Sequence, residues 1–213
     1  MKTLKIISLL LLLIGLLYCR NDDNGKEPET VEEPFDITQY VIVSLSKKTS
    51  DIHSIQTFEK DAEGVSMEYS AFLIVKDTYT YNNGILKTFS NVTYNKEFKI
   101  ENGVIVSSSN SQGYNNTLVK IPSTNQLNGN TYSGSWKKNG STLMTFATLK
   151  FSNTHFSEAS LIPPEPNKSY EIIKNIGALS ITADKRTLWV WVNGKLEGSR
   201  LSSGVSAGTF TKQ

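Results

Sequence analysis

Four of the six Asn-Gly pairs in this chain divide much of it into short segments in which apolar and polar side chains alternate. A two-residue type I′ turn needs a positive φ at both central residues, and Asn followed by Gly adopts that conformation at low cost. The pairs are Asn83-Gly84, Asn102-Gly103, Asn139-Gly140 and Asn193-Gly194. Repeated turns of this kind predict an antiparallel meander of β-hairpins.

The segments between these turns are rich in Val, Ile, Thr, Tyr and Phe, the residues that favour strands. The predicted strands span residues 40–45, 67–75, 78–81, 86–94, 104–108, 131–136, 143–151, 170–173 and 187–192. The stretch 57–66 is expected to form either one helical turn or a loop. We therefore predict an all-β fold with little helix after residue 18, in which the meander closes into a barrel or folds into a β-sandwich.

The N-terminus combines a short basic start with an apolar run. Lys2 and Lys5 precede residues 6–17, which are interrupted only by Ser8 and Gly15. A helix needs about 20 apolar residues to span a bilayer, so this run is too short for a stable membrane anchor. It has the length of the apolar region of an export signal, and residues 1–18 are predicted to be a signal peptide.

The apolar run ends at Cys19, the single cysteine of the chain. The sequence Leu16-Leu17-Tyr18-Cys19 resembles the lipobox of bacterial lipoproteins, in which a Leu three residues before an invariant Cys directs lipidation and cleavage. Tyr18 departs from the pattern, which has Gly, Ala or Ser at that position. The resemblance implies a lipid attached covalently to Cys19, no other cofactor, and export to the outer membrane or the cell surface.

An acidic segment follows the cysteine. Residues 20–34 carry six acidic and two basic side chains, and Val31 is their single aliphatic residue. Such a composition buries too little apolar surface to offset chain entropy, so residues 19–34 are predicted to be a lipidated, disordered tether. The tether is either a plain spacer or, through Asp22-Asp23, similar to the surface-export signal of some lipoprotein-rich bacteria.

The remaining residues, 35–213, are expected to form the folded domain. They carry 18 basic and 14 acidic side chains without a clustered basic surface, so a nucleic-acid partner is not expected. Their length suits one substantial core or two half-units of about 35–122 and 123–213. Residues 83–94 and 139–151 share a pattern after their Asn-Gly pairs, which indicates either an old duplication or two similar hairpins.

The second half carries a further resemblance. Residues 127–136 read LNGNTYSGSW, and Gly134-Ser135-Trp136 matches the G-x-W pattern of lipocalins. This part is similar to the small lipocalin-like domains of many bacterial lipoproteins. Only 77 residues follow Trp136, so the resemblance implies either a barrel that begins earlier or a reduced version of one.

The motifs typical of catalysis are incomplete. Residues 204–208 spell G-x-S-x-G, but the triad of that motif needs a later His, and none follows. The two histidines, His53 and His155, are distant in sequence and are expected at the surface or at sheet edges. We therefore predict neither an enzyme nor a metal site.

The strongest binding candidates are the three tryptophans, Trp136, Trp189 and Trp191. Residues 187–192 are apolar on both faces of a strand, so Trp189 and Trp191 either line the interior or form an outer patch that grips a ligand. The insert at 161–166 is predicted to be a rim loop. The functional hypotheses are a membrane-anchored protein whose β domain binds a glycan, an apolar ligand or a protein partner, and alternatively a structural or assembly lipoprotein or a host-interacting adhesin.

Overall fold

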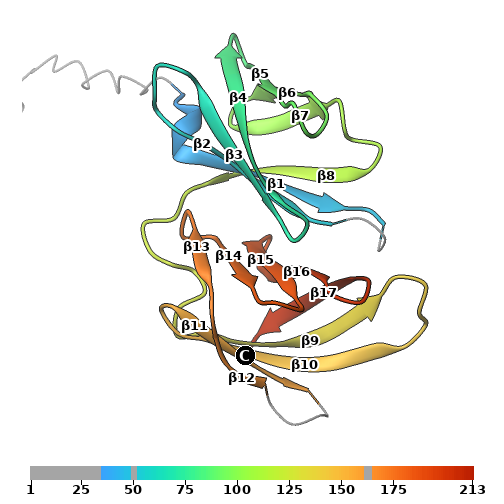
Figure 1. Cartoon of the computed structure of the whole chain (residues 1–213). Helices are drawn as coiled ribbons and strands as arrows, with labels where there is room; N and C mark the ends of the chain where they lie inside the picture. The colour runs from blue at the N-terminus through green and yellow to red at the C-terminus, as the bar shows by residue number, and fades with distance from the viewer. Residues whose placement is uncertain (1–34, 49–51, 161–164) are drawn as a thin grey trace, which may run out of the picture. The chain divides into compact units, whose positions relative to one another are not determined.

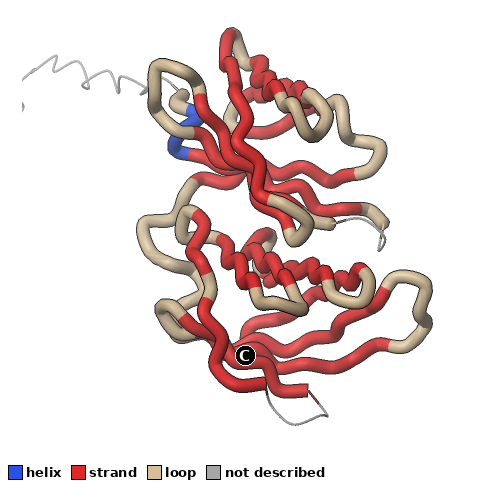
Figure 2. Tube along the Cα trace, in the orientation of Figure 1, coloured by secondary structure: helices blue, strands red, loops and turns tan. Residues whose placement is uncertain are grey.

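The structure is a computed structural model that describes residues 35–48, 52–160 and 165–213. The predicted signal peptide, Cys19, the tether and most of the predicted rim loop lie outside these residues. Strands account for most of the described chain (Figure 2), and its single helix is the short 3-10 helix η1 (Ile37–Gln39). The side chain of Asp36 caps this helix by accepting a hydrogen bond from the amide nitrogen of Thr38 at 3.0 Å.

The first sheet contains eight antiparallel strands. They are β1 (Tyr40–Ser46), β2 (Ser54–Phe58), β3 (Val65–Ser70), β4 (Ile74–Asn82), β5 (Ile85–Phe89), β6 (Lys96–Glu101), β7 (Val104–Ser108) and β8 (Tyr114–Lys120). Their order is β7-β6-β5-β4-β3-β2-β1-β8. The first seven strands form a meander, and β8 returns to pair with β1.

The second sheet contains nine antiparallel strands. They are β9 (Thr131–Lys138), β10 (Met144–Phe151), β11 (His155–Ser160), β12 (Glu165–Ser169), β13 (Glu171–Ile173), β14 (Gly177–Ile181), β15 (Arg186–Val192), β16 (Lys195–Leu201) and β17 (Val205–Lys212). Their order is β12-β11-β10-β9-β17-β16-β15-β14-β13, so the last strand again pairs with the first. Each sheet curls into a nearly closed barrel-shaped arrangement (Figure 1), which confirms the all-β prediction.

The turns follow the predicted chemistry at three of the four Asn-Gly pairs. Asn83, Asn102 and Asn193 have φ angles of 48°, 50° and 52°, and each following glycine is also positive. At Asn139-Gly140 only the glycine has a positive φ, of 75°. The turn between β13 and β14 reaches the same left-handed conformation with two residues that are not glycine, Lys174 and Asn175.

Two predicted strands were wrong in their extent. The predicted strand 67–75 is divided by a turn, because the Ser70 hydroxyl accepts hydrogen bonds from the amides of Phe72 and Leu73. The predicted strand 86–94 ends at Phe89, and residues 90–95 form a loop. The stretch 57–66 belongs to β2, a loop and β3, so the loop alternative is confirmed over 59–64. The predicted strands did not include the segments of β2, β6, β8, β11, β12, β14, β16 and β17.

The position of β15 between two apolar cores accounts for its sequence, which is apolar on both faces. Trp189 belongs to the core inside the second sheet, whereas Leu188, Val190 and Val192 belong to a core that also contains residues of the first sheet. Val41, Val43 and Ile55 are the first-sheet members at its centre. The strand is apolar on both faces because one face meets the barrel interior and the other meets the neighbouring sheet.

The two similar segments do not occupy equivalent places. In each sheet the first strand pairs with the last, which makes β1 and β9 topological counterparts. Asn83-Gly84 joins β4 to β5, whereas Asn139-Gly140 joins β9 to β10. The two segments are therefore not counterparts in a repeated unit. Their similarity is that of two hairpins with similar residues.

Candidate functional site

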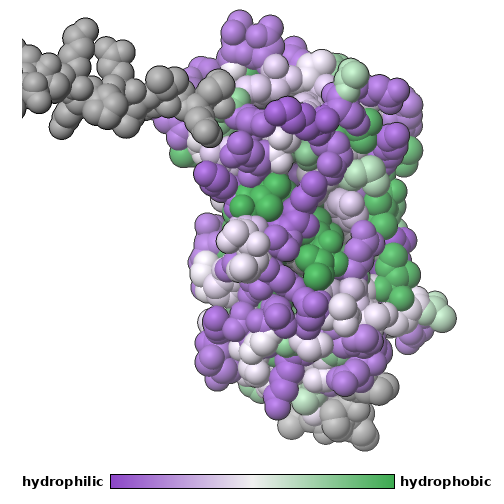
Figure 3. All heavy atoms as spheres, turned by 90° about the vertical axis from the view of Figure 1, so that its left-hand side faces the viewer, coloured by the Kyte–Doolittle hydropathy of each residue, from purple (hydrophilic) through white to green (hydrophobic). Residues whose placement is uncertain are grey.

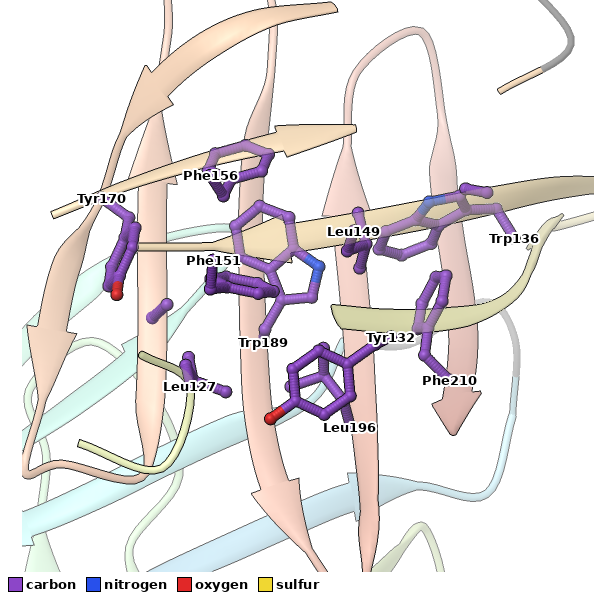
Figure 4. Packing of buried hydrophobic residues seen from close by; sticks show 12 residues of the cluster. Leu127, Tyr132, Trp136, Leu149, Phe151, Phe156, Tyr170, Trp189, Leu196 and Phe210 are labelled. Carbon is purple, nitrogen blue, oxygen red and sulfur yellow. The ribbon is translucent and has the colours of Figure 1, made fainter. Parts of the chain in front are cut away.

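The interior of the second sheet is filled with aromatic side chains. Figure 4 shows Trp189 beside Phe151 and Phe156, whose ring centroids lie 5.6 and 4.5 Å from the centroid of the tryptophan ring. Trp189 is fully buried, and Trp136 is 4% exposed. Of the two placements expected for Trp189 and Trp191, Trp189 has the interior one, and Trp136 belongs to the same core.

The third tryptophan lies nearer the surface. Trp191 is partly buried and packs on Tyr132, with 5.6 Å between ring centroids. It also lines a groove of about 420 Å³ together with residues of β8 such as Leu118. The structure thus gathers Trp136 and Trp189 into one core and places Trp191 at its margin, so the three rings do not form an outer patch.

A buried ion pair closes one end of this second interior. Glu158 contacts Arg200 and also accepts a hydrogen bond from Nε1 of Trp136 at 2.9 Å. The Arg200 guanidinium lies over the Trp136 ring, 3.9 Å from its centroid. Because each charged group has close partners, these three residues are explained by the stability of the fold.

The interior of the first sheet is different, because it is apolar at one end and polar at the other. Ile42, Phe58, Leu86, Phe98 and Ile100 form the apolar end. The cross-strand partners Gln56 and Glu68, and the next pair Ser44 and Ser54, face the same interior. Polar residues at these inward positions interrupt the usual alternation of apolar-in and polar-out.

The polar end opens into a cavity of about 740 Å³, which we call the β1–β8 cavity. Its walls come from β1, β2, β3, β6 and the start of β8 and from the two loops 90–95 and 109–113. The side chains that line it include Ser54, Glu68, Thr93, Tyr94, Lys96 and Asn110. This volume lies within the roughly 300–1,000 Å³ of known small-molecule sites.

A buried ion pair lies in the wall of this cavity. Nζ of Lys96 donates a hydrogen bond to Oε1 of Glu68 at 2.5 Å, and the two side chains are 12% and 10% exposed. The second carboxylate oxygen of Glu68, Oε2, is buried without a hydrogen-bond partner among the described residues. A buried acceptor without a donor is costly, so this atom marks a place where a donor would be stabilised.

Asp77 supplies a second carboxyl close to the pair. It is buried on β4 and does not line the cavity. Burial raises the pKa of Asp77, and a hydrogen bond from the Ser90 hydroxyl opposes this effect. The neutral form of this carboxyl is therefore favoured relative to that of an exposed aspartate.

Hydrogen bonds hold both loops of the cavity. The amide nitrogen Nδ2 of Asn116 donates to Oγ of Ser108 at 2.8 Å and to Oδ1 of Asn110 at 2.7 Å. In the other loop, Oδ1 of Asn95 accepts a hydrogen bond from the amide of Ser90 at 3.0 Å. These contacts fix the loop residues that surround the opening, which is the condition for a preformed site.

Sequence reasoning missed this site. Glu68 and Lys96 are 28 residues apart, and each lies in a segment with no known motif. The signal that was present is a pair of strand segments, 54–58 and 65–70, whose inward positions are Ser, Gln and Glu instead of aliphatic residues.

The expectation that both histidines lie at the surface or at sheet edges was wrong for His53, which is buried directly before β2, a strand inside the first sheet. His155 is exposed, whereas His53 is 6% exposed and its Nδ1 accepts a hydrogen bond from the amide of Ser46 at 3.1 Å. Burial lowers the pKa of His53 from 6.5 to about 4. A neutral imidazole is needed for this hydrogen bond, so the contact with Ser46 depends on pH.

We expect acidification to destabilise the fold through His53. The unfolded state takes up the proton near pH 6.5 and the folded state only near pH 4, so stability falls as the pH drops through that window, by about 3 kcal/mol for this group. Urea unfolding at pH 7.5 and pH 4.5 measures the effect, and His53→Asn should reduce the difference. The exposed His155→Asn is the control. An unchanged pH dependence in His53→Asn would contradict the assignment.

The remaining sequence motif also receives a structural explanation. Ser206, at the centre of the G-x-S-x-G match, lies in β17 with Lys138 and Arg200 as its cross-strand partners. A nucleophile of that motif needs a sharp turn between a strand and a helix, which this regular strand does not provide. Within residues 35–48, 52–160 and 165–213, no three His, Cys, Asp or Glu side chains are grouped to hold a metal ion.

In comparisons with known proteins, no family model, no curated protein and no solved structure matched this chain. None of the helical structure in the described residues has the length and apolar character required to cross a bilayer. The function is therefore argued from the β1–β8 cavity and from the sequence.

Proposed function

We propose that this chain is an exported, lipid-anchored protein of the outer membrane or cell surface that binds a small polar ligand in the β1–β8 cavity. The observation that carries the binding role is the contrast between the two interiors. Both interiors hold a buried ion pair, but the second is packed with aromatic rings, whereas the first opens into a cavity where Oε2 of Glu68 has no hydrogen-bond partner among the described residues. Burying an acceptor without a donor is costly, and a ligand that donates a hydrogen bond to this oxygen would offset that cost.

The groups around the cavity favour binding without catalysis. Glu68 is the carboxylate of the cavity wall, and Lys96 already engages one of its oxygens. The other polar wall groups used here, on Ser54, Thr93 and Asn110, are hydroxyls and an amide, which hold a ligand but are poor acids and bases.

The anchor is supported by the sequence alone. Two lysines, the apolar run 6–17 and the sole cysteine follow one another in the order of a lipoprotein signal. A lipidated Cys19 followed by the acidic tether would attach the β domain to a membrane.

We expect Cys19→Ala to abolish incorporation of a labelled fatty acid. The bacterial cells that express the chain are grown with radiolabelled palmitate, and the immunoprecipitated protein is examined by gel and autoradiography. Loss of the only cysteine removes the only thiol that can accept diacylglycerol. The matched control is Ser44→Ala, which changes the fold domain and leaves Cys19 intact. Equal labelling of Cys19→Ala and of the unchanged chain would disprove the anchor.

A role as an assembly protein or adhesin is favoured by a different observation. The start of β10 and the loop before it expose three apolar side chains, Leu143, Met144 and Phe146. Figure 3 shows that hydrophobic residues form separate patches among polar ones on the face it presents. A protein partner would cover such side chains. Crosslinking in whole membranes with Phe146→Asp as the comparison distinguishes this role, since the substitution should remove a partner held there without affecting the β1–β8 cavity.

A further inference from the structure

We infer that the ligand of the β1–β8 cavity is a small neutral saccharide of one or two rings. This inference rests on the proposed binding function and adds the chemical class of the ligand. It follows from the charge balance of the cavity wall, from its unpartnered polar atoms and from an exposed aromatic ring at its opening.

The charge balance favours a neutral ligand. Glu68 and Lys96 neutralise each other through the 2.5 Å contact. An anionic ligand would bring a second negative charge close to Oε2 of Glu68. A cationic ligand would compete with Lys96 for the Glu68 carboxylate and would be repelled by the Lys96 ammonium. A neutral ligand leaves the pair intact and avoids the cost of separating two buried charges.

The unpartnered atoms favour hydroxyl groups. Among the residues that the structure describes, Oε2 of Glu68 and Oγ1 of Thr93 are both buried without a hydrogen-bond partner. Lys96 uses one of its three protons on Glu68, and Oδ1 of Asn110 is occupied by Asn116, which leaves donors on the Lys96 ammonium and on the Asn110 amide. The wall therefore offers both donors and acceptors at close quarters. A hydroxyl group both donates and accepts, and a sugar carries several of them on one rigid ring.

The opening of the cavity supplies the apolar contact that a sugar ring needs. Tyr94 lies in the 90–95 loop, lines the cavity and is 87% exposed. An aromatic ring at the mouth of a polar site packs well against the C–H face of a sugar while its hydroxyl stays hydrated. The Tyr94 ring is therefore available at the cavity to pack against a bound sugar.

The test is isothermal titration of the purified chain with galactose, N-acetylglucosamine and maltose, and with putrescine and succinate as charged probes of similar size. We expect at least one saccharide to bind and both charged probes to fail. Glu68→Gln should weaken saccharide binding by about 10–100-fold, the value of a hydrogen bond to a charged group. Tyr94→Ala should weaken it by about 3–10-fold, and Tyr94→Phe should restore most of the affinity.

Matched controls separate the site from general effects. Glu97→Gln changes an exposed carboxylate on the same strand as Lys96, and Phe146→Ala removes an exposed aromatic ring in the second sheet. Both should bind the saccharide normally. Because Tyr94 is exposed, Tyr94→Ala tests the site even if Glu68→Gln, which leaves Lys96 without its partner, does not fold.

The possible failures are distinguishable. Binding of putrescine or succinate that requires Glu68, with no saccharide bound, would overturn the saccharide class and leave the binding function standing. Saccharide binding that neither Glu68→Gln nor Tyr94→Ala weakens would overturn the location. If no probe of this panel binds, the saccharide inference is wrong. If, in addition, a wide library of small polar molecules gives no thermal shift, the proposed binding function is wrong as well.

Discussion

Replacing Trp189 with alanine is expected to lower the free energy of unfolding by about 3–5 kcal/mol, the range for removal of a large buried aromatic side chain. Trp189 is fully buried, and its ring contacts Phe151 and Phe156 at the centre of the second interior (Figure 4). Neighbouring rings that belong to different strands cannot all move into the space that it leaves. Chemical denaturation followed by circular dichroism measures the loss.

Two further variants make this prediction specific. Nε1 of Trp189 is buried without a hydrogen-bond partner among the described residues, so Trp189→Phe keeps an aromatic ring and removes an unsatisfied donor. Its cost should be clearly smaller than that of the alanine variant. Leu143→Ala changes a side chain that is 79% exposed and should have almost no effect. If Trp189→Ala lowered the free energy of unfolding only slightly, the second interior would not be a tightly packed core.

The second large effect is expected at Glu158. Glu158→Gln leaves the Arg200 guanidinium buried without its counter-charge, and the free energy of unfolding should fall by about 3–5 kcal/mol. The side chains of Glu158 and Arg200 are 7% and 12% exposed, so solvent screens their interaction only weakly. The double variant Glu158→Gln with Arg200→Met removes both charges and should regain much of the loss.

An exposed ion pair provides the comparison. Nζ of Lys87 lies 3.1 Å from Oε2 of Glu97, and both side chains are about half exposed. Lys87→Ala should cost no more than about 1 kcal/mol, because water and salt screen exposed charges. If Glu158→Gln and Lys87→Ala had equal costs, the Glu158–Arg200 pair would have to be far more hydrated than its burial indicates.

The fold class was predictable because local signals agreed with the tertiary structure. At Asn83, Asn102 and Asn193, the turn residues adopt the positive φ that their type favours. Strand β2 was missed for a physical reason. Its outward residue Ile55 packs on the neighbouring sheet, while Ser54 and Gln56 face the polar interior, so the segment has no apolar stripe. Tertiary contacts decide such a strand, and its own sequence does not.

The tryptophans of β15 show what the apolar pattern of a strand can predict and what it cannot. Residues 187–192 correctly indicated that both faces of β15 are apolar. The choice between a core and a ligand surface depended on what covers the strand, and that was decided by the first sheet, through residues such as Val43 and Ile55. The sequence of β15 alone therefore could not decide whether its tryptophans lie in a core or at a ligand surface.

The β1–β8 cavity could not be predicted, because its parts come from different hairpins. Glu68 lies in β3 and Lys96 begins β6, and their contact exists only after the sheet has curled. The 90–95 loop was predicted as a continuation of a strand, since Val92 and Tyr94 prolong the alternation of β5. The Ser90 hydroxyl ends the strand by accepting hydrogen bonds from the amides of Val92 and Thr93.

Because the first strand pairs with the last strand in each sheet, the sheet cannot be completed until its last strand has been synthesised. Ser44 of β1 bonds to Asn116, 72 residues later, and Thr211 of β17 bonds to Ser133, 78 residues earlier. One edge of each sheet therefore stays unpaired until nearly the whole of that sheet has left the ribosome. Contacts so distant in sequence slow folding, and an open edge can pair with another chain in the meantime. A cell that makes this protein has to keep such edges apart until the sheets close.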